Sequence, residues 1–308
     1  MTLKTTKNEA HKRRMREANS MIILPLIHIF IFCYLPMFGV IIAFKDYRYA
    51  RGIFGSKWVG LKNFEIFWKS NDIWKIVGNT IWLNLSFMFL LIIAGVILAV
   101  LLFELKNSTA LKVYHTTMIT PHFVSWVIGG YVVYALLSPE TGAINGILKG
   151  LGIAPVQWYA EARLWPGILA IANTWKHVGM RSILYYAALM GVDPTLFEAA
   201  EMDGANKIQK IWYISIPSIK SLIIMMSILA LGGIFSADFG LFYSVPMNSG
   251  LLYETTDVID TYIFRALKEV GDVGMSSAVG LFQSVVGFVT VVTTNTIVNK
   301  IDSDSALF

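Results

Sequence analysis

The segment EAAEMDGANKIQKIWYISIP occupies residues 198–217 and lies between two strongly apolar stretches. It contains seven residues with charged or amide side chains, so in a chain that crosses a membrane it belongs to an aqueous loop between two spans. The local pattern predicts two short helices. Asp193 can cap the first helix, Pro194 suits its first turn, and Gly204 can end it with a positive φ. Pro217 is expected to close the second helix before the chain re-enters the membrane.

The composition of the chain is that of an integral membrane protein. Of its 308 residues, 56% are hydrophobic and only 15% are charged, and the mean hydropathy is +0.60. These values are too apolar for an ordinary soluble domain. The one cysteine, Cys33, excludes an internal disulfide and a cysteine-based metal cluster, and no metal site is expected because the histidines have no ligand spacing.

The apolar runs predict an all-α membrane protein with six transmembrane helices. A helix needs about 20 apolar residues to cross a bilayer core of about 30 Å. Runs of about this length occupy residues 21–44, 81–103, 113–137, 164–192, 219–237 and 274–299. Pro121 falls inside the third run, where a proline is expected to kink the helix. We therefore predict a six-helix transmembrane domain over residues 21–299, with a loop at 193–217 and short tails at 1–20 and 300–308.

The orientation follows from the distribution of basic residues. Six of them lie in the N-terminal tail: Lys4, Lys7, Lys12, Arg13, Arg14 and Arg16. This cluster favours an anionic cytoplasmic leaflet as its partner over nucleic acid, and an even number of spans places both termini in the cytoplasm. The segments 45–72 and 254–272 then face outward. The aromatic residues of 45–72 at helical spacing predict an amphipathic stretch at the outer interface, and the apolar residues of 254–272 fit either an interfacial helix or a loop helix packed on neighbouring spans.

Residues 198–217 carry a resemblance to a known protein family. Glu198-Ala199-Ala200, Asp203-Gly204-Ala205, Ile214 and Pro217 match, in residue type and spacing, the EAA signature of permease subunits of binding-protein-dependent ABC importers. Residues 36–64, 77–86 and 173–205 resemble sugar permeases of the maltose type, especially the branch associated with complex oligosaccharides and polysaccharide fragments. The resemblance covers nearly the whole chain after the N-terminal tail.

The resemblance implies a fold, partners and a coupling site. The EAA segment would form the cytoplasmic coupling helix that docks on an ATPase, with polar contacts from Glu198, close packing at two alanines and a turn at Gly204. The expected coupling residues are Glu198, Ala199, Ala200, Asp203, Gly204, Ala205 and Pro217. The implied partners are a second permease in a heterodimer, two ATPase subunits or domains, an extracellular solute-binding protein and an oligosaccharide.

The chain itself is not expected to be an enzyme. It contains no G-x-x-x-x-G-K-[ST] phosphate loop, so ATP and Mg²⁺ are expected in the partner ATPase, with no cofactor in this chain.

A polar interruption of the fourth span predicts the substrate pathway. The run NTWKHVGMRS places Lys176 and His177 about 18 Å from the outer end, where an ionisable group needs a wet cavity or a partner. The candidate pathway residues are Asn173, Trp175, Lys176, His177, Met180, Arg181, Phe235, Asp238 and Phe239. Asn173-Thr174-Trp175 resembles a run that supplies pocket residues in a maltose-type permease, but the similarity ends after Trp175.

Several interpretations of these residues stay open at this point. Lys176 fits a ligand contact as well as a pair with Asp238 or with carbonyl groups at a helix end, and the phenylalanines fit packing as well as stacking on sugar. A basic pocket suits an acidic oligosaccharide, although lysine also binds neutral hydroxyls. An importer of another polar solute is the alternative within the family. An ion-coupled secondary transporter is the alternative outside it, disfavoured by the EAA segment and the absence of an inverted repeat. A membrane enzyme is disfavoured because the sequence has no paired catalytic residues beyond Lys176 and His177.

Overall fold

The computed structural model describes residues 15, 20–70, 72–105, 107–302 and 306. The tails expected at residues 1–20 and 300–308 fall mostly outside these residues. The described residues are mostly helical, which confirms the all-α fold class, and the strands among them form one short hairpin of β1 (Lys45–Asp46) and β2 (Lys57–Trp58). The chain divides into two compact units, one formed by residues up to 70 with 266–281, the other by residues 71–265 with 282–308.

The first unit contains the N-terminal apolar helix and the hairpin. The helix runs over Ser20–Phe44 and is followed by the hairpin and a short helical layer. The other elements of this unit are α2 (Leu35–Met37, within the first helix), α3 (Gly52–Gly55), α4 (Lys62–Trp68), the π-helical turn Ala266–Val270 and the first residues of α17 (Val273–Ile301). The amide of Asn63 donates hydrogen bonds to the carbonyl oxygens of Ala43 and Lys45, at 2.8 and 3.0 Å, and ties α4 to the end of the first helix. The expected helical stretch at 45–72 is therefore only partly helical, because the hairpin takes up its first half.

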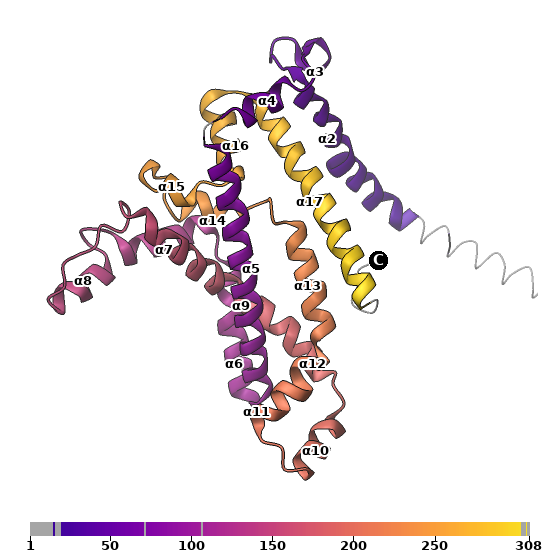
Figure 1. The fold of residues 1–308 in the computed structure, drawn as a ribbon, viewed down its shortest axis with the longest axis vertical. Helices are drawn as coiled ribbons and strands as arrows, with labels where there is room; N and C mark the ends of the chain where they lie inside the picture. The colour runs from indigo at the N-terminus through magenta and orange to yellow at the C-terminus, as the bar shows by residue number, and fades with distance from the viewer. Residues whose placement is uncertain (1–14, 16–19, 71, 106, 303–305, 307–308) are drawn as a thin grey trace, which may run out of the picture. The chain divides into compact units, whose positions relative to one another are not determined.

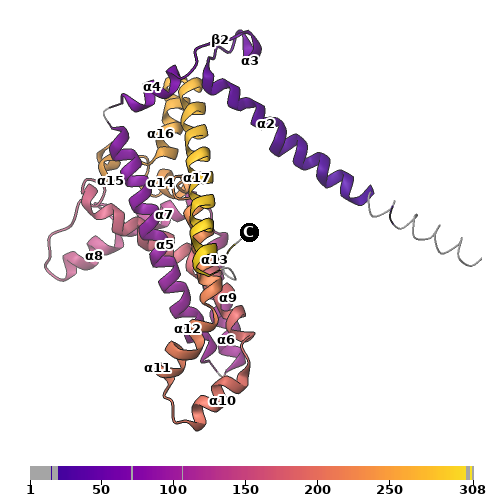
Figure 2. The ribbon, with the colours of Figure 1, turned by 45° about the vertical axis from the view of Figure 1, so that its right-hand side comes forward.

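The second unit carries both regions that the sequence singled out. Its main elements are α5 (Ile73–Phe103), α6 (Ser108–Ile119), α7 (Trp126–Leu137), α8 (Ala143–Gly150), α9 (Trp165–Met190), α10 (Pro194–Met202), α11 (Lys207–Lys210), α12 (Ile216–Ser218), α13 (Lys220–Gly232), α14 (Phe239–Ser244), α15 (Tyr253–Thr256), α16 (Ile259–Arg265) and the rest of α17. α5 and α9 run side by side through the unit, and α10 and α11 lie at one end of it (Figures 1 and 2).

The core of the second unit forms where α5 and α9 face each other. Trp165 and Leu169 of α9 are fully buried and pack with Leu83 of α5 and Leu241 of α14. Gly95 of α5 allows the two helices to approach closely, since a Cβ atom there would lie 3.2 Å from the Cβ atom of Arg181. The apolar run 81–103, which has no charged residue, forms most of α5, but the helix starts at Ile73, earlier than the expected residue 81, and includes Lys75 in its first turn.

The predicted third span is not one straight helix. The helical segments Ser108–Phe123 and Trp126–Leu137 meet at an angle of 101°. Pro121 lies in the 3₁₀ turn that ends the first segment, and Ser125 caps the second by accepting a hydrogen bond from the amide of Ile128. A proline kink alone was expected here. The bend is much sharper because the chain leaves helical geometry at Val124 and starts a new capped helix.

The fifth predicted span is also divided. α13 ends at Gly232, short of the expected residue 237, and the segments Lys207–Ser218 and Lys220–Gly232 meet at 57°. Among the described residues, three helices are long and apolar enough to cross a membrane, and each bent pair adds one at most. α9 is not among them because polar and charged residues interrupt it, so the count of six spans stays a prediction.

Candidate functional site

The EAA segment forms a two-helix bracket, by which we mean residues 193–217 with α10 and α11 at its centre. The side chain of Asp193 accepts a hydrogen bond from the amide of Thr195 at 2.9 Å, Pro194 stands in the first turn, and α10 ends at Met202. The same amide and the Thr195 hydroxyl hold the pKa of the Asp193 carboxyl below its ordinary value of 3.8. The predicted start of this helix is confirmed.

The end of α10 is a Schellman turn. Gly204 has a φ of +78°, its amide donates to the carbonyl oxygen of Glu201, and the amide of Ala205 donates to that of Ala200. A left-handed residue at this position needs glycine, because a Cβ atom would crowd the following carbonyl. The predicted role of Gly204 is confirmed.

The second half of the bracket differs from the prediction. Asn206 and Gln209 form a reciprocal capping box at the start of α11, which the sequence reading had not included. Pro217 does not close this helix. It lies inside α12, directly after the π-helical turn Ile211–Ser215, and the backbone changes direction at Ile219 instead.

Three side-chain contacts fix the bracket. Lys210 Nζ lies 2.6 Å from Glu201 Oε1 and joins α11 to α10. The rings of Phe197 and Phe103 are 5.5 Å apart, and Lys207 Nζ lies 3.4 Å from Glu104 Oε2. Two of these contacts reach the end of α5, so the bracket is connected to that helix as well as to α9 and α13.

Several of the residues expected to contact the ATPase lie on the solvent-exposed face of α10 or at its end. Glu198, Ala199 and Asp203 are exposed, and Ala200 and Ala205 are half-buried. Met202 is 89% exposed and Leu196 is exposed beside it. An apolar and acidic face of this kind, at the end of a membrane unit, fits a protein partner better than water.

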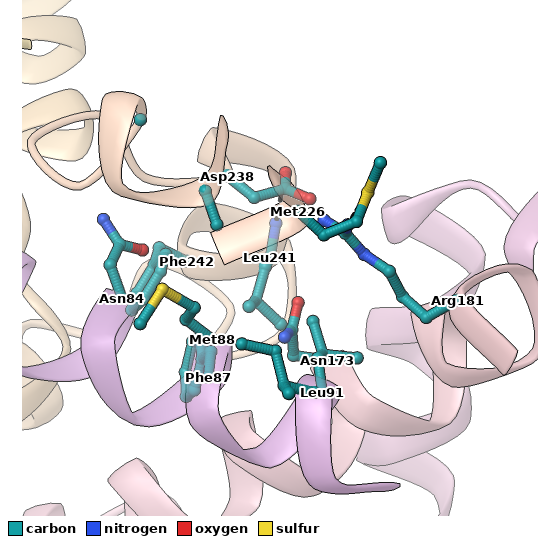
Figure 3. A pocket seen from close by; sticks show the side chains of 13 residues that line it. Asn84, Phe87, Met88, Leu91, Asn173, Arg181, Met226, Asp238, Leu241 and Phe242 are labelled. Atoms are coloured by element: carbon teal, nitrogen blue, oxygen red, sulfur yellow. Dashed lines mark hydrogen bonds between the residues drawn. The ribbon is translucent and has the colours of Figure 1, made fainter. Parts of the chain in front are cut away.

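A pocket of about 160 Å³ lies within the helices of the second unit (Figure 3). It is enclosed by α5, α9, α13, α14 and the chain between the last two. Its lining is Asn84, Phe87, Met88, Leu91, Ile92, Asn173, Arg181, Met226, Ala230, Gly233, Asp238, Leu241 and Phe242. The structure therefore brings three of the predicted pathway residues together: Asn173, Arg181 and Asp238.

Arg181 is the cation of the pocket. Its side chain extends from α9 toward Met226 and Asp238 (Figure 3). Its hydrogen-bond partner among the described residues is the sulfur of Met226, 3.3 Å from Nη1. A thioether is a weak acceptor, so the guanidinium keeps most of its capacity to bind an anion.

Asp238 serves as a structural carboxylate. One oxygen accepts hydrogen bonds from the amides of Gly240 and Leu241 and caps α14, and the other accepts from the indole of Trp126 at 2.5 Å. His177 Nε2 lies 4.0 Å from that second oxygen. The expected pair between Asp238 and Lys176 is not present among the described contacts.

Lys176 lies outside the pocket and stabilises the bend. Its ammonium group donates hydrogen bonds to the carbonyl oxygens of His122, at 3.0 Å, and Val124, and lies 5.2 Å from the ring centre of Trp126. These carbonyls belong to the break between α6 and α7. Of the interpretations left open for Lys176, the structure shows the contact with helix-end carbonyls.

The remaining predicted pathway residues do not line the pocket. Phe239 packs on Tyr243 and Phe264, with ring centres 5.0 and 4.8 Å away, and Phe235 meets Phe282. Trp175 is 45% exposed on another face of α9, and Met180 is half-buried.

The residues of α5 that line the pocket were not predicted from the sequence. Asn84 donates hydrogen bonds from its amide to the carbonyl oxygens of Ile234 and Ser236, at 2.8 and 3.3 Å, and so fixes the chain that leads into α14. Its amide in an otherwise apolar span was the signal available in the sequence. Phe87, Met88 and Leu91 gave no such signal, because apolar residues in a span are indistinguishable from packing.

Comparison with known proteins places this architecture in a family. Residues 91–303 match the model of the binding-protein-dependent transport system inner membrane component. The chain belongs to this family. The match includes the whole bracket and the pocket residues of α9, α13 and α14.

Individual members of the family agree with this assignment. Protein LplB of Bacillus subtilis is 35% identical over 91% of this chain and 87% of its own length. The polygalacturonan/rhamnogalacturonan transport system permease protein YteP of the same organism is 32% identical over the same shares. A crystal structure of a bacterial ABC transporter involved in the import of the acidic polysaccharide alginate matches with a TM-score of 0.86 and 29% identity, over 96% of this chain and 99% of that one. The chain is thus a membrane-embedded permease of the ABC importer type.

Proposed function

We propose that this permease forms one half of the translocation pathway of an ABC importer for acidic oligosaccharides. The observation that carries the proposal is Arg181, a cation in the wall of an intramembrane pocket whose described hydrogen-bond partner is a thioether. A charge at this depth is costly, and such residues mark substrate pathways. A guanidinium binds carboxylates through two parallel hydrogen bonds, so a uronate carboxylate fits it.

The other lining residues suit the rest of a sugar ring. Asn173 supplies an amide that can bind hydroxyl groups, and Phe87 and Phe242 supply aromatic surface. The pocket is smaller than the roughly 300–1,000 Å³ of most ligand sites. A second permease is therefore expected to complete it, as the resemblance to heterodimeric importers implies.

The names of the relatives support an acidic substrate. The structural neighbour is described as an importer of the acidic polysaccharide alginate, and the relative YteP is named for polygalacturonan and rhamnogalacturonan, which contain uronate sugars. The arabinooligosaccharides transport system permease protein AraP of Halalkalibacterium halodurans, 28% identical over 68% of this chain, supports a neutral oligosaccharide as the second candidate.

The bracket is the part of the permease through which ATP hydrolysis would be coupled to transport. We propose that α10 docks on a separate ATPase, which holds ATP and Mg²⁺, and that a binding protein delivers the sugar outside. A related alginate transporter structure is described in complex with a periplasmic protein bound to an alginate pentasaccharide. Both termini of the permease would then lie in the cytoplasm, and alternating access would carry the sugar inward.

The test is uptake by the full complex in proteoliposomes loaded with ATP. Labelled uronate oligosaccharides are compared with neutral ones of the same length, for wild type and Arg181→Gln. We expect the variant to lose about tenfold or more of uronate uptake, the factor for a hydrogen bond between charged groups, and to change neutral uptake much less. Arg163→Gln is the control, because Arg163 is exposed and pairs with Glu161. Equal uptake of uronates by Arg181→Gln and wild type would contradict the proposal.

A further inference from the structure

An apolar cluster closes the pocket on the side that faces the bracket. Its buried members are Ala99, Val100, Tyr185, Leu189 and Ile219. On both α5 and α9 these residues come after the pocket residues and before the bracket. Met226 lines the pocket and also packs against the cluster. The cluster thus lies between the pocket and the bracket along these helices, and we call it the pocket floor.

The pocket floor contains a polar atom without a partner. The hydroxyl of Tyr185 is buried, the whole residue is 0% exposed, and the hydroxyl has no hydrogen-bond partner among the described residues. A buried hydroxyl without a partner costs free energy that phenylalanine would not. A buried hydroxyl of this kind is explained if it forms a hydrogen bond in another conformational state of the protein.

Tyr185 lies on the same face of α9 as Arg181, one turn further toward the bracket. The two are four residues apart, so their levels along the helix differ by about 6 Å. The Cβ atom of Arg181 and the ring of Tyr185 both lie against Gly95 of α5: a Cβ atom at Gly95 would lie 3.2 Å from Arg181 Cβ and 3.2 Å from Tyr185 Cε2. Along α9, Tyr185 is about one helical turn nearer the bracket than Arg181.

We infer that the Tyr185 hydroxyl is a second hydrogen-bonding site for the sugar, used when the pocket floor opens toward the bracket. In the present arrangement the floor is packed shut and the hydroxyl is idle. When α5, α9 and α13 separate at this level, a sugar hydroxyl moving past Arg181 meets a group that both donates and accepts. The inference rests on the proposed function, since it requires that the pocket carries an oligosaccharide.

The experiment compares Tyr185→Phe with wild type in the full complex. Three quantities are measured: the melting temperature of the complex, ATP-dependent uptake of a labelled uronate oligosaccharide, and ATP hydrolysis stimulated by the loaded binding protein. We expect a melting temperature that is equal or higher, stimulated hydrolysis close to wild type, and uptake lowered about fivefold, the factor for one hydrogen bond of about 1 kcal/mol. Tyr186→Phe is the matched control, because Tyr186 is the next residue of α9, is half-buried at the edge of the pocket floor, and packs its ring on that of His115, with ring centres 4.8 Å apart.

Each result has a defined meaning. Uptake by Tyr185→Phe equal to that of wild type would overturn the inference, and so would an equal loss in Tyr186→Phe. A lower melting temperature would also overturn it, because it would show that the hydroxyl is bonded within the folded chain. Absence of uptake by the wild-type complex is a separate result and contradicts the proposed function itself.

Discussion

The bracket and the pocket are built from contacts of different range. In the bracket, the capping and turn hydrogen bonds at the ends of α10 and the start of α11 join residues two to five positions apart, and three side-chain contacts of longer range are added to them. In the pocket, the walls come from α5, α9, α13 and α14, and the bond from Asn84 to Ile234 spans 150 positions. The bracket can therefore be altered locally without loss of the membrane unit, whereas changes at the helix crossings around the pocket affect the fold.

The same substitution should act differently in the two regions. A Cβ atom at Gly179 would lie 1.9 Å from the carbonyl oxygen of Met118, so Gly179→Ala forces α6 and α9 apart and is expected to cost about 3 kcal/mol or more. At Gly204 a Cβ atom meets nothing within 4 Å, and the cost of about 1–2 kcal/mol comes from the positive φ alone. Yield and melting temperature of the complex should fall strongly for Gly179→Ala and little for Gly204→Ala.

The control for this pair is Gly167→Ala on the same helix. A Cβ atom at Gly167 has no neighbour within 4 Å. This variant should fold as wild type does. If Gly179→Ala also folds normally, the close crossing of α6 and α9 is not needed, and the comparison fails.

Glu198→Ala should separate coupling from folding. Glu198 is exposed on α10 and serves no contact in the described bracket, so its removal should leave the melting temperature unchanged. Uptake should fall about tenfold or more through the loss of a charged contact with the ATPase. Glu198→Gln, which keeps the shape and one acceptor, should be less impaired. Wild-type uptake by Glu198→Ala would remove this residue from the coupling surface.

The ion pair between Lys207 and Glu104 tests whether the bracket acts on α5. Lys207 is 77% exposed at its side chain, so the pair is worth only about 0.5 kcal/mol. Glu104→Lys should lower uptake about twofold. The double variant Glu104→Lys with Lys207→Glu restores the attraction and should recover the loss. Equal uptake in the single and double variants would show that this link does not contribute.

The cap at Asp193 should have the smallest effect. Its pKa is lower in the folded chain than the ordinary value of 3.8, so its stabilisation of α10 is complete above that value and is lost as the pH falls below it. Uptake at neutral pH should therefore not depend on this group's titration. Asp193→Asn, which still caps, should match wild type, and Asp193→Ala should show a small loss of uptake. A loss in Asp193→Asn equal to that in Asp193→Ala would assign the effect to the charge instead of the cap.

The sequence predicted the bracket well for a physical reason. A capping aspartate, a first-turn proline and a glycine at the C-terminal turn act on their immediate neighbours, so Asp193, Pro194 and Gly204 were placed correctly. Pro217 was expected to close the second helix, but the helical segment continues to Ser218 and the backbone changes direction at Ile219. The all-α class followed from composition alone.

The pocket was predicted only where a polar residue interrupts a span. Asn173, Arg181 and Asp238 were found in this way, but depth alone could not distinguish Arg181, which lines the pocket, from Lys176, which binds carbonyls at the bend. That bend arises between α6 and α7 and was expected only as a kink. The apolar wall of α5 could not be predicted, because a residue that faces a pocket and one that faces a neighbouring helix have the same character.

The most direct test of the account is ATP-dependent accumulation of a labelled uronate oligosaccharide by the complete complex in proteoliposomes. The complex contains this permease, its paired permease, the ATPase and a loaded binding protein. The account predicts inward accumulation that requires ATP, exceeds that of a neutral oligosaccharide of equal length, and is abolished or strongly reduced by Glu198→Ala. Accumulation that proceeds without ATP in an ion gradient, or that shows no preference for the acidic sugar, would contradict it.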